Sequence, residues 1–349
     1  MPSDPKAAFR THSNYLLAFC TLIDTNYSTR RPFPPRQAEV LQGVSDAIRT
    51  SRTFTGLKLP SSAVDASALR RALRNSWGTE LLLGLSGRFA DDDLVGVANN
   101  WAVVQAYYAC YHSVQALILA RGQVGPMSHA KLQQHYASFW VTRRVNLPPW
   151  SLGWHSGACR NLPSDRCVRR IHQWKACHED TCWDLVAQAL RTTRKELLGE
   201  RIGDERERRQ TGNRKTWEQE EQRRLSRGQR PRKKPRFPLP RLTAPEKEKL
   251  DSGLRPTTIV DYLYRLRKKS NYEDPTMFTD GPEDPSDSTQ VHRNLCNVTC
   301  ATLLAHELHV GRLIGRAHLE SLVDEWLDGS AASGPEIGLR LRRDLIVNP

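Results

Sequence analysis

An almost continuously apolar segment, NNWAVVQAYYACYHSVQALILARG, occupies residues 99 to 122 of this 349-residue chain. A helix that is apolar on nearly every face is buried on nearly every face. Gly122 supplies the left-handed conformation that commonly ends a helix. The segment therefore predicts a central buried helix, whose interior between Trp101 and Ala120 is interrupted by Gln105, His112, Ser113 and Gln115.

The sequence SHAKLQQHYASFW follows at residues 128 to 140 and predicts a second core helix. Ser128 can cap it, and Leu132, Tyr136 and either Phe139 or Trp140 share one face. Similar spacing recurs elsewhere, whereas no stretch alternates apolar and polar residues as a half-buried strand would. We therefore expect an all-α fold, with further helices near 12–24, 36–50, 62–75, 77–87, 255–269 and 289–327.

Changes in composition divide the chain into a helical bundle, its flanks and an insertion. Residues 1–95 are expected to form an N-terminal helical extension, and residues 329–349 a tail that leaves the body. The bundle combines residues 96–140 with residues 254–328. Between these two parts lies an insertion at 141–253, which begins among tryptophan, proline, cysteine and histidine residues and then becomes rich in charge.

The cations of the chain outnumber its anions and are mostly arginine. The formal charge is +14, with 40 Arg against 12 Lys. Planar guanidinium groups bind phosphate in a bidentate manner, so nucleic acid is the leading class of partner. The alternative is that a GC-rich genome raises the arginine content throughout, and that the charge only maintains solubility.

The sequence shows no pattern for export or membrane insertion. Its start, MPSDPKAAFR, lacks the charged-then-apolar order of a secretory signal. The apolar run at residues 15–23 falls far below the ~20 residues of a transmembrane helix. We expect a cytoplasmic protein with no membrane partner. In a reducing compartment its eight cysteines are expected as thiols or metal ligands rather than as disulfides.

Four cations in five positions, followed by an acidic pair, mark residues 265–274, RLRKKSNYED. Cations in the last turn of a helix interact favourably with its dipole, and Asn271 suits a left-handed stop. The run is therefore either an ordinary helix end or the edge of a site that binds phosphate. Thr258, three residues before Asp261, predicts that this helix starts in a capping box.

Three segments precede the long closing helix in a fixed order: QAYYACYHSVQALILARG (105–122), SHAKLQQHYASFW (128–140) and YRLRKKSNYEDPTMF (264–278). Together they resemble HEPN domains. The resemblance implies an antiparallel bundle of four or five helices that often dimerises. Many such proteins are metal-independent ribonucleases that act as toxins or antiviral effectors, while others bind nucleotides or are purely structural.

In the catalytic members of this family, an arginine followed after four to six residues by histidine lies near the dimer seam, so two copies make one site. Arg267 matches the family arginine and Asn271 lies beside the expected position, but Tyr272 stands where histidine is expected. A phenol with a pKa near ~10 is a poor proton carrier at neutral pH. His112 on the central helix is a candidate for the missing imidazole, and its alternative is a hydrogen-bonded core histidine.

The resemblance thus predicts a protein directed at RNA, and a ribonuclease effector of antiphage defence or a toxin is the leading function. Arg267 would hold phosphate, while Asn271 and Tyr272 would orient the substrate. One alternative is a binding module without catalysis that partners another component of a defence or toxin–antitoxin system. A second is a nucleotide-sensing module in which Tyr272 is modified. A homodimer is expected from the family.

Cysteine and histidine residues cluster between residues 155 and 182. Zinc needs four such ligands in a tetrahedral array, and a zinc site can order an insertion with little core of its own. The alternative is a set of thiols packed beside the tryptophans, because the spacings differ from the Cys-x2-Cys pairs of familiar zinc fingers. The predicted ligands, for which His155 or His172 can substitute, are Cys159, Cys167, Cys177 and Cys182.

Residues 222–241, QRRLSRGQRPRKKPRFPLPR, hold nine cations and no anion among prolines. Such a segment cannot bury enough apolar surface to order itself, so we expect it to be mobile in the free protein. It can bind a single RNA strand, because counterion release drives such binding and aromatic residues stack on bases. A solvated linker is the alternative. The candidate contacts are Arg223, Arg224, Arg227, Arg230, Arg232, Lys233, Lys234 and Arg236.

Overall fold

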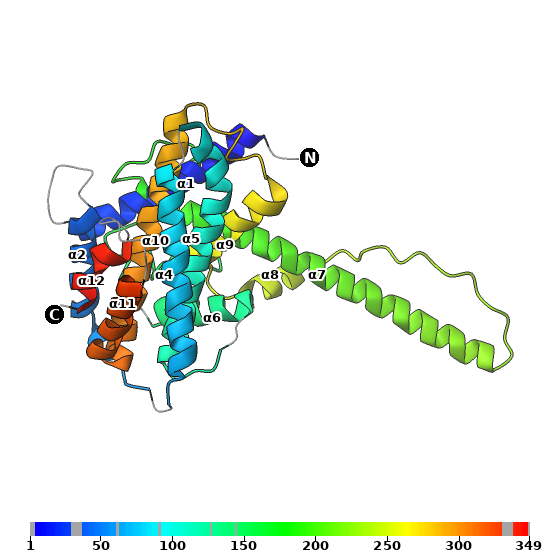
Figure 1. The fold of residues 1–349 in the computed structure, drawn as a ribbon. Coiled ribbons are helices and arrows are strands. Elements are labelled where there is room, and N and C mark those ends of the chain that lie inside the picture. The colour runs from blue at the N-terminus through cyan, green and yellow to red at the C-terminus, as the bar shows by residue number, and fades with distance from the viewer. Residues whose placement is uncertain are drawn as a thin grey trace.

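Helices make up almost all of the regular structure (Figure 1). The computed structural model of the protein describes residues 4–28, 37–60, 63–89, 92–125, 128–143, 145–329 and 338–347. Within these ranges the strands form a single two-stranded hairpin. The prediction of a mainly helical fold is confirmed. In the same ranges, no helix combines the length and the apolar composition that crossing a bilayer requires.

The helices fall into a body and an inserted region. The body contains α1 (Pro5–Tyr27), α2 (Gln37–Thr50), α3 (Arg52–Thr55), α4 (Ala66–Phe89), α5 (Asp92–Ala120), α6 (His129–Trp140), α9 (Ile259–Lys268), α10 (Pro285–Ile314), α11 (Arg316–Gly329) and α12 (Gly338–Val347). A π-helical turn, η1 (Lys269–Glu273), extends α9. The inserted region contains β1 (Gly153–His155), β2 (Ala158–Arg160), α7 (Cys182–Ser226) and α8 (Ala244–Ser252).

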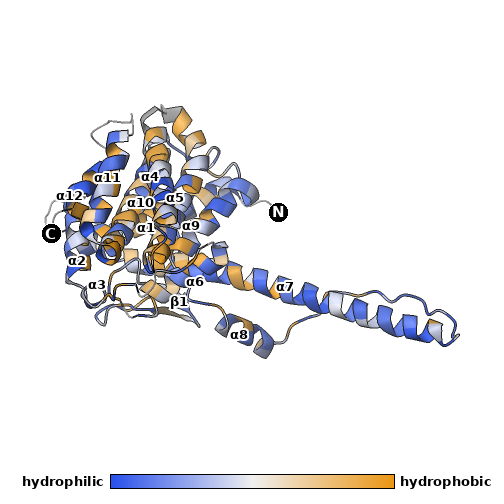
Figure 2. Ribbon diagram, turned by 60° about the horizontal axis from the view of Figure 1, so that its bottom comes forward, coloured by the Kyte–Doolittle hydropathy of each residue, from blue (hydrophilic) through white to orange (hydrophobic). Residues whose placement is uncertain are grey.

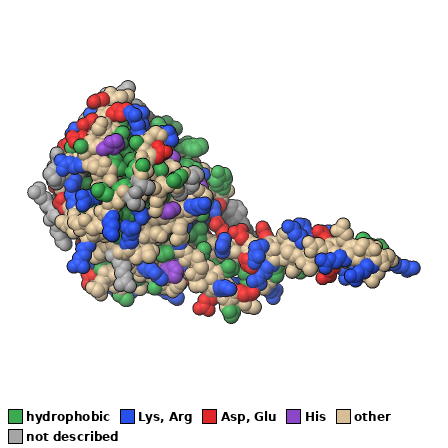
Figure 3. All heavy atoms as spheres, turned by 90° about the horizontal axis from the view of Figure 1, so that it is seen from below, with side chains coloured by type: hydrophobic (Ala, Val, Ile, Leu, Met, Phe, Trp, Pro, Cys, Tyr) green, Lys and Arg blue, Asp and Glu red, His purple; other side chains and the backbone are tan. Residues whose placement is uncertain are grey.

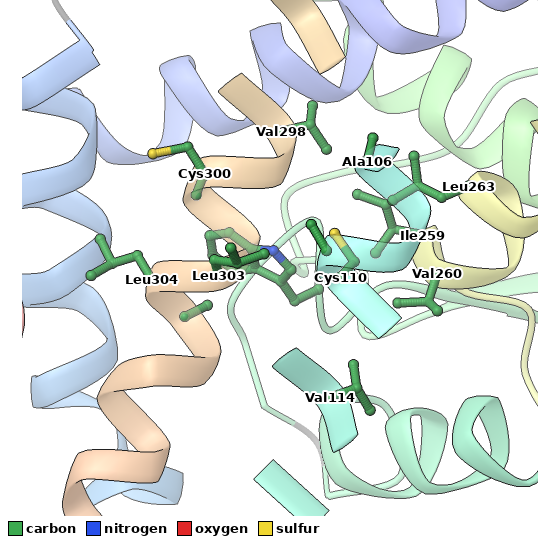
Figure 4. Close-up of a cluster of buried hydrophobic side chains, with 14 of the residues drawn as sticks. Ala106, Cys110, Val114, Ile259, Val260, Leu263, Val298, Cys300, Leu303 and Leu304 are labelled. Atoms are coloured by element: carbon green, nitrogen blue, oxygen red, sulfur yellow. The ribbon is translucent and has the colours of Figure 1, made fainter. Parts of the chain in front are cut away.

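The central helix is α5, which packs along α4 and α10 and also contacts α6 and α9. Figure 4 shows Ala106, Cys110 and Val114 of α5 among apolar side chains of α9 and α10. After α5 the chain turns at Gly122, whose φ is 71°. The expected central helix and its left-handed stop are therefore both confirmed, but Trp101 near its start is exposed rather than buried.

The N-terminal residues belong to the same core as the bundle. Helix α1 packs on α10 and α7, and α2 packs on α10. The two helices expected at 62–75 and 77–87 are one helix, α4, because nothing in the sequence breaks it at Ser76 and Trp77. Both side chains are buried, and Ser76 Oγ donates to the carbonyl of Ala109 at 2.9 Å. Helices α1, α2 and α4 thus contribute buried residues to the same core as α5 and α10.

The closing part of the chain differs from expectation in two respects. The single helix expected at 289–327 is broken at Gly315, whose φ of 91° no continuous helix allows, so α10 and α11 are separate. The prediction that the tail leaves the body is wrong for the residues of α12. Helix α12 packs on α2, α4, α10 and α11, and its Arg342 is fully buried between Glu80 and Glu307.

The outer part of α7 and the chain that returns along it project from the body as an arm (Figures 1 and 2). The apolar side chains that α7 buries all lie between Cys182 and Leu190, and Figure 2 shows the outer part of the helix as mostly hydrophilic. Beyond Ser226 the chain returns along the helix. At the base, Arg194 is buried and pairs with Asp251 through Nε and Oδ1 at 2.7 Å. The first turns of α7 are therefore part of the body, and the rest is solvent-exposed.

Candidate functional site

The cation run at the end of α9 separates into paired side chains and one unpaired side chain. Arg265 pairs with Glu196, Lys268 with Glu200, and Lys269 with Glu273 and Asp274. Arg267 has no ion pair with any described residue, and its buried Nε has no hydrogen-bond partner there. Three of the four cations therefore stabilise the helix end through ion pairs. Of these four, only Arg267 has a guanidinium that is free to pair with a ligand.

Three tyrosine rings hold the guanidinium of Arg267. Its central carbon lies 4.9 Å from the ring centre of Tyr108 and 5.8 Å from those of Tyr107 and Tyr264. Tyr264 and Arg267 share one face of α9 because they are three residues apart. Cation–π contacts orient the group without neutralising its charge, unlike a carboxylate. The tyrosine rings thus fix the orientation of the Arg267 side chain and leave its positive charge unneutralised.

A histidine that the sequence did not single out completes this group. His129 Nδ1 lies 2.7 Å from the hydroxyl of Tyr107, and its ring centre lies 5.1 Å from that of Tyr264. Desolvation lowers the pKa of His129, and the positive charge of Arg267 lowers it further. A neutral imidazole at pH 7 can accept a proton. We call Arg267, Tyr107, Tyr108, Tyr264 and His129 the Arg267 cluster.

His112 borders the Arg267 cluster without reaching Tyr272. Its ring stacks on Tyr108 at 6.2 Å, and its Nδ1 lies 3.3 Å from Oε1 of Gln115. Burial lowers its pKa and the hydrogen bond to Gln115 opposes this shift. Tyr272 is 72% exposed and makes no ring contact with described residues. The structure therefore brings His112 to the ring that contacts Arg267, but not to Tyr272.

The helix end itself differs from the predicted stop. Asn271 does not take a left-handed conformation, and the chain continues through the π-helical turn η1. Ser270 is buried there, and its Oγ donates to the carbonyl of Asn100 on α5 at 2.8 Å. The start of α9 agrees with its prediction, because Asp261 Oδ2 accepts the N–H of Thr258 at 2.7 Å. The end of α9 is therefore tied to α5, and its start is capped.

The basic run at 222–241 has defined contacts, which differs from the expected mobility. Glu221 of α7 accepts from both Nε and the backbone N–H of Arg232, at 2.6 and 2.5 Å. Lys234 pairs with Glu218, and the ring of Phe237 meets that of Trp217. The carboxylates and the indole of α7 hold the run in position. They supply the anionic and aromatic partners that the run itself does not contain.

The eight candidate RNA-binding cations of this arm fall into two groups, those with an ion pair and those without one. Arg224, Arg232 and Lys234 have carboxylate partners on α7. The remaining five are exposed and have no ion pair with a described residue. Figure 3 shows Lys and Arg along the arm and prevailing at its far end. The unpaired set, which we call the arm cations, consists of Arg223, Arg227, Arg230, Lys233 and Arg236.

The structure does not bring the four predicted zinc ligands together as one group. Cys167 is exposed, while Cys177 donates to Oγ1 of Thr21 and Cys182 to the carbonyl of Glu179. Burial raises the pKa of Cys159 and of Cys182 to about 12, so both stay protonated. Within the described ranges no three His, Cys, Asp or Glu side chains are grouped to hold a metal ion. This arrangement favours the alternative of packed thiols.

Comparison with models of known protein families, with curated proteins and with solved structures finds no match to this chain. The Arg267 cluster is thus interpreted from its own chemistry. It joins three elements that are separate in the sequence, α5, α6 and α9. Sequence reasoning identified Arg267 and the neighbouring His112. It missed His129, for which the only local signal is its place directly after the capping Ser128.

Proposed function

We propose that this chain is an RNA-directed, HEPN-like protein that binds the phosphate backbone at the Arg267 cluster and cleaves it without a metal ion. The observation that supports this most strongly is the isolated charge of Arg267. Among the described residues its guanidinium contacts tyrosine rings and pairs with no carboxylate, so a phosphate oxygen meets little competition. The tyrosine rings beside it offer surfaces on which bases can stack.

His129 supplies the proton chemistry in this proposal. The 2′-hydroxyl of a ribose attacks the adjoining phosphorus, which forms a 2′,3′-cyclic phosphate and releases the 5′-oxygen of the next nucleotide. His129 accepts the proton of the 2′-hydroxyl, and the 5′-oxygen takes up a proton from solvent water as it leaves. Arg267 stabilises the negative charge that builds up on the phosphate oxygens. Tyr107 orients the imidazole through the 2.7 Å contact with Nδ1.

The arm recruits the RNA, and a second copy of the chain completes the assembly. The arm cations attract a strand by counterion release. A homodimer follows from the HEPN resemblance, and an exposed apolar stripe on α5 at Leu94, Val97 and Trp101 supports it. Such a protein would serve as a cytoplasmic effector of antiphage defence or as a toxin.

The decisive experiment is cleavage of a mixed RNA by purified protein, with and without EDTA. We expect cleavage that EDTA leaves unchanged, with products that carry a cyclic phosphate. Arg267→Ala and His129→Asn should each lower the rate by at least about 100-fold. Lys268→Ala is the matched control, because it removes one positive charge from the adjacent position and should retain the rate within about twofold.

The outcomes separate the proposal from its alternative. Cleavage that Arg267→Ala leaves intact would show that another site acts. If the wild type binds RNA but does not cleave it, and Arg267→Ala weakens binding, the chain is a binding module that partners another component of a defence or toxin–antitoxin system. His112→Asn tests the other imidazole: a decrease equal to that of His129→Asn would assign the proton transfer to both.

A further inference from the structure

A cavity of about 300 Å³ lies in the inserted region, apart from the Arg267 cluster. It is open to solvent and is bordered by the β1–β2 hairpin, the loop that follows it and the first turns of α7. Its lining contains no carboxylate; it consists of Trp154, Gly157, Val168, Arg169, Arg170, Gln188 and Arg191. A space of this size holds a small ligand, and its positively charged lining attracts an anion.

The three cavity arginines are unpaired, whereas arginines beside them are paired. Arg166 pairs with Asp165, and Arg194 pairs with Asp251. The guanidinium groups of Arg169, Arg170 and Arg191 form no ion pair or hydrogen bond with a described residue. Three like charges around one cavity repel each other, and a bound anion removes that repulsion. The cavity therefore favours a ligand with a phosphate or similar group.

The cavity also offers an aromatic surface. The guanidinium carbon of Arg191 lies 5.8 Å from the ring centre of Trp154. A planar heterocycle can stack on either the indole or the guanidinium plane. Gln188, one turn before Arg191 on α7, adds an amide that can both donate and accept hydrogen bonds. The lining of this cavity thus combines arginines that can bind a phosphate with an aromatic surface on which a planar ring can stack.

The walls of the cavity are held in place before any ligand binds. Trp154 exchanges two backbone hydrogen bonds of 2.9 Å with Thr257, next to the start of α9. Asp184 of α7 accepts the backbone N–H of Arg169 at 2.6 Å, which ties the loop to the helix. Gly157, with a φ of 83° and open space where a Cβ would lie, leaves the rim unobstructed. A preformed site loses little entropy on binding.

We propose that this cavity is a binding site for a nucleotide, with the phosphate held by Arg169, Arg170 and Arg191 and the base stacked at Trp154. Binding here does not depend on the proposed cleavage at the Arg267 cluster. The ligand is either a free mononucleotide or the phosphorylated terminal nucleotide of an RNA strand, since both present the same phosphate and ring.

The test is calorimetric titration of the full chain in an Arg267→Ala background, which removes the other expected phosphate contact. The ligands are AMP, adenosine, inorganic phosphate and a 5′-phosphorylated trinucleotide. We expect AMP to bind at least about tenfold more tightly than adenosine or phosphate alone. Arg191→Gln and Arg170→Gln should each weaken AMP binding by about tenfold or more, because each removes a charged hydrogen-bond donor.

Arg166→Gln is the matched control. Arg166 lies in the same loop and also stacks on a tryptophan, Trp183 at 5.6 Å, but it is paired with Asp165 and lies outside the cavity. It should leave AMP binding unchanged. Tighter binding of the trinucleotide than of AMP identifies an RNA end, and the reverse order identifies a free nucleotide. Equal binding of phosphate and AMP, or AMP binding that Arg191→Gln leaves intact, overturns the proposal.

Discussion

At the scale of single residues, the role of each arginine follows from the presence or absence of a carboxylate beside it. Arg265 and Arg267 are two positions apart on α9, yet the first is paired with Glu196 and the second is held by aromatic rings. An ion pair satisfies a guanidinium and makes it structural, whereas an unpaired guanidinium retains its affinity for phosphate. Arg342 is the clearest example of an arginine whose ion pairs make it structural.

Replacing Arg342 should destabilise the body strongly. Arg342 is fully buried, and its guanidinium hydrogen-bonds Glu80 and Glu307, which are also buried. Arg342→Met leaves two carboxylates in the core without a counter-charge, which typically costs about 3–5 kcal/mol. Urea unfolding of the variant should show a decrease of this order in the free energy of unfolding.

Arg343→Ala is the control, because the adjacent side chain is partly exposed and pairs with Asp324 at 2.7 Å. The decrease for this variant should stay below about 1 kcal/mol. Should Arg342→Met unfold at the same urea concentration as Arg343→Ala, α12 would not be docked on the body as described.

At the scale of elements, α7 shows which interactions stabilise a long charged helix that lies outside a hydrophobic core. Its outer part buries no apolar side chain, so the helix relies on local pairs such as Glu205 with Arg208 and Arg209, three and four residues on. The returning chain adds contacts, including Arg206 Nε to the carbonyl of Pro240 at 2.9 Å. The arm is therefore stable in shape but contributes little to the stability of the body.

Removing the outer arm should weaken RNA binding without changing the fold. Gln210 donates to the carbonyl of Phe237, so a short Gly-Ser loop can join these residues in place of 211–236. The excised segment contains ten Lys or Arg and three Asp or Glu. We expect an unchanged melting temperature, weaker RNA binding at low salt, and a flatter dependence of affinity on salt.

A second variant tests the charge of the arm separately from its shape. It replaces the five arm cations by Gln and keeps the ion pairs made by Arg224, Arg232 and Lys234. Its salt slope should fall by about 0.7 for each phosphate that the arm no longer neutralises. Equal RNA affinity of both variants and the wild type at two salt concentrations would assign the arm to the linker alternative.

The sequence predicted elements better than their assembly. Helices α5, α6 and α9 were identified because apolar periodicity, Ser128 and the Thr258–Asp261 capping box are local signals. The meeting of His129 with Tyr107 depends on how two helices pack, which no local pattern encodes. The same holds for Arg342, whose partners are 35 and 262 positions away. Arg267 could be selected as a candidate, but its isolation from carboxylates is visible only in three dimensions.

At the scale of the whole molecule, α5 serves both the core and the surface. One side packs in the body, while Leu94, Val97 and Trp101 lie exposed at helical spacing, with Trp101 65% exposed. Tyr108 of the Arg267 cluster continues the same face, seven residues beyond Trp101. An exposed apolar stripe of this kind often marks a surface that binds another protein. Two copies that pair along this stripe would place both Arg267 clusters beside one seam, as the HEPN resemblance implies.

Trp101→Glu should therefore separate the proposed homodimer into monomers. A buried, unpaired carboxylate at the centre of the seam opposes association, so the dissociation constant should rise at least about tenfold. Light scattering coupled to gel filtration should give twice 39.7 kDa for the wild type and 39.7 kDa for the variant. Leu59→Glu is the matched control, because Leu59 is also exposed, at 69%, but lies away from α5 in sequence and should leave the mass unchanged. A wild-type mass of one chain across the measured concentrations would remove the dimer from the proposal and leave the Arg267 cluster to act within a single copy.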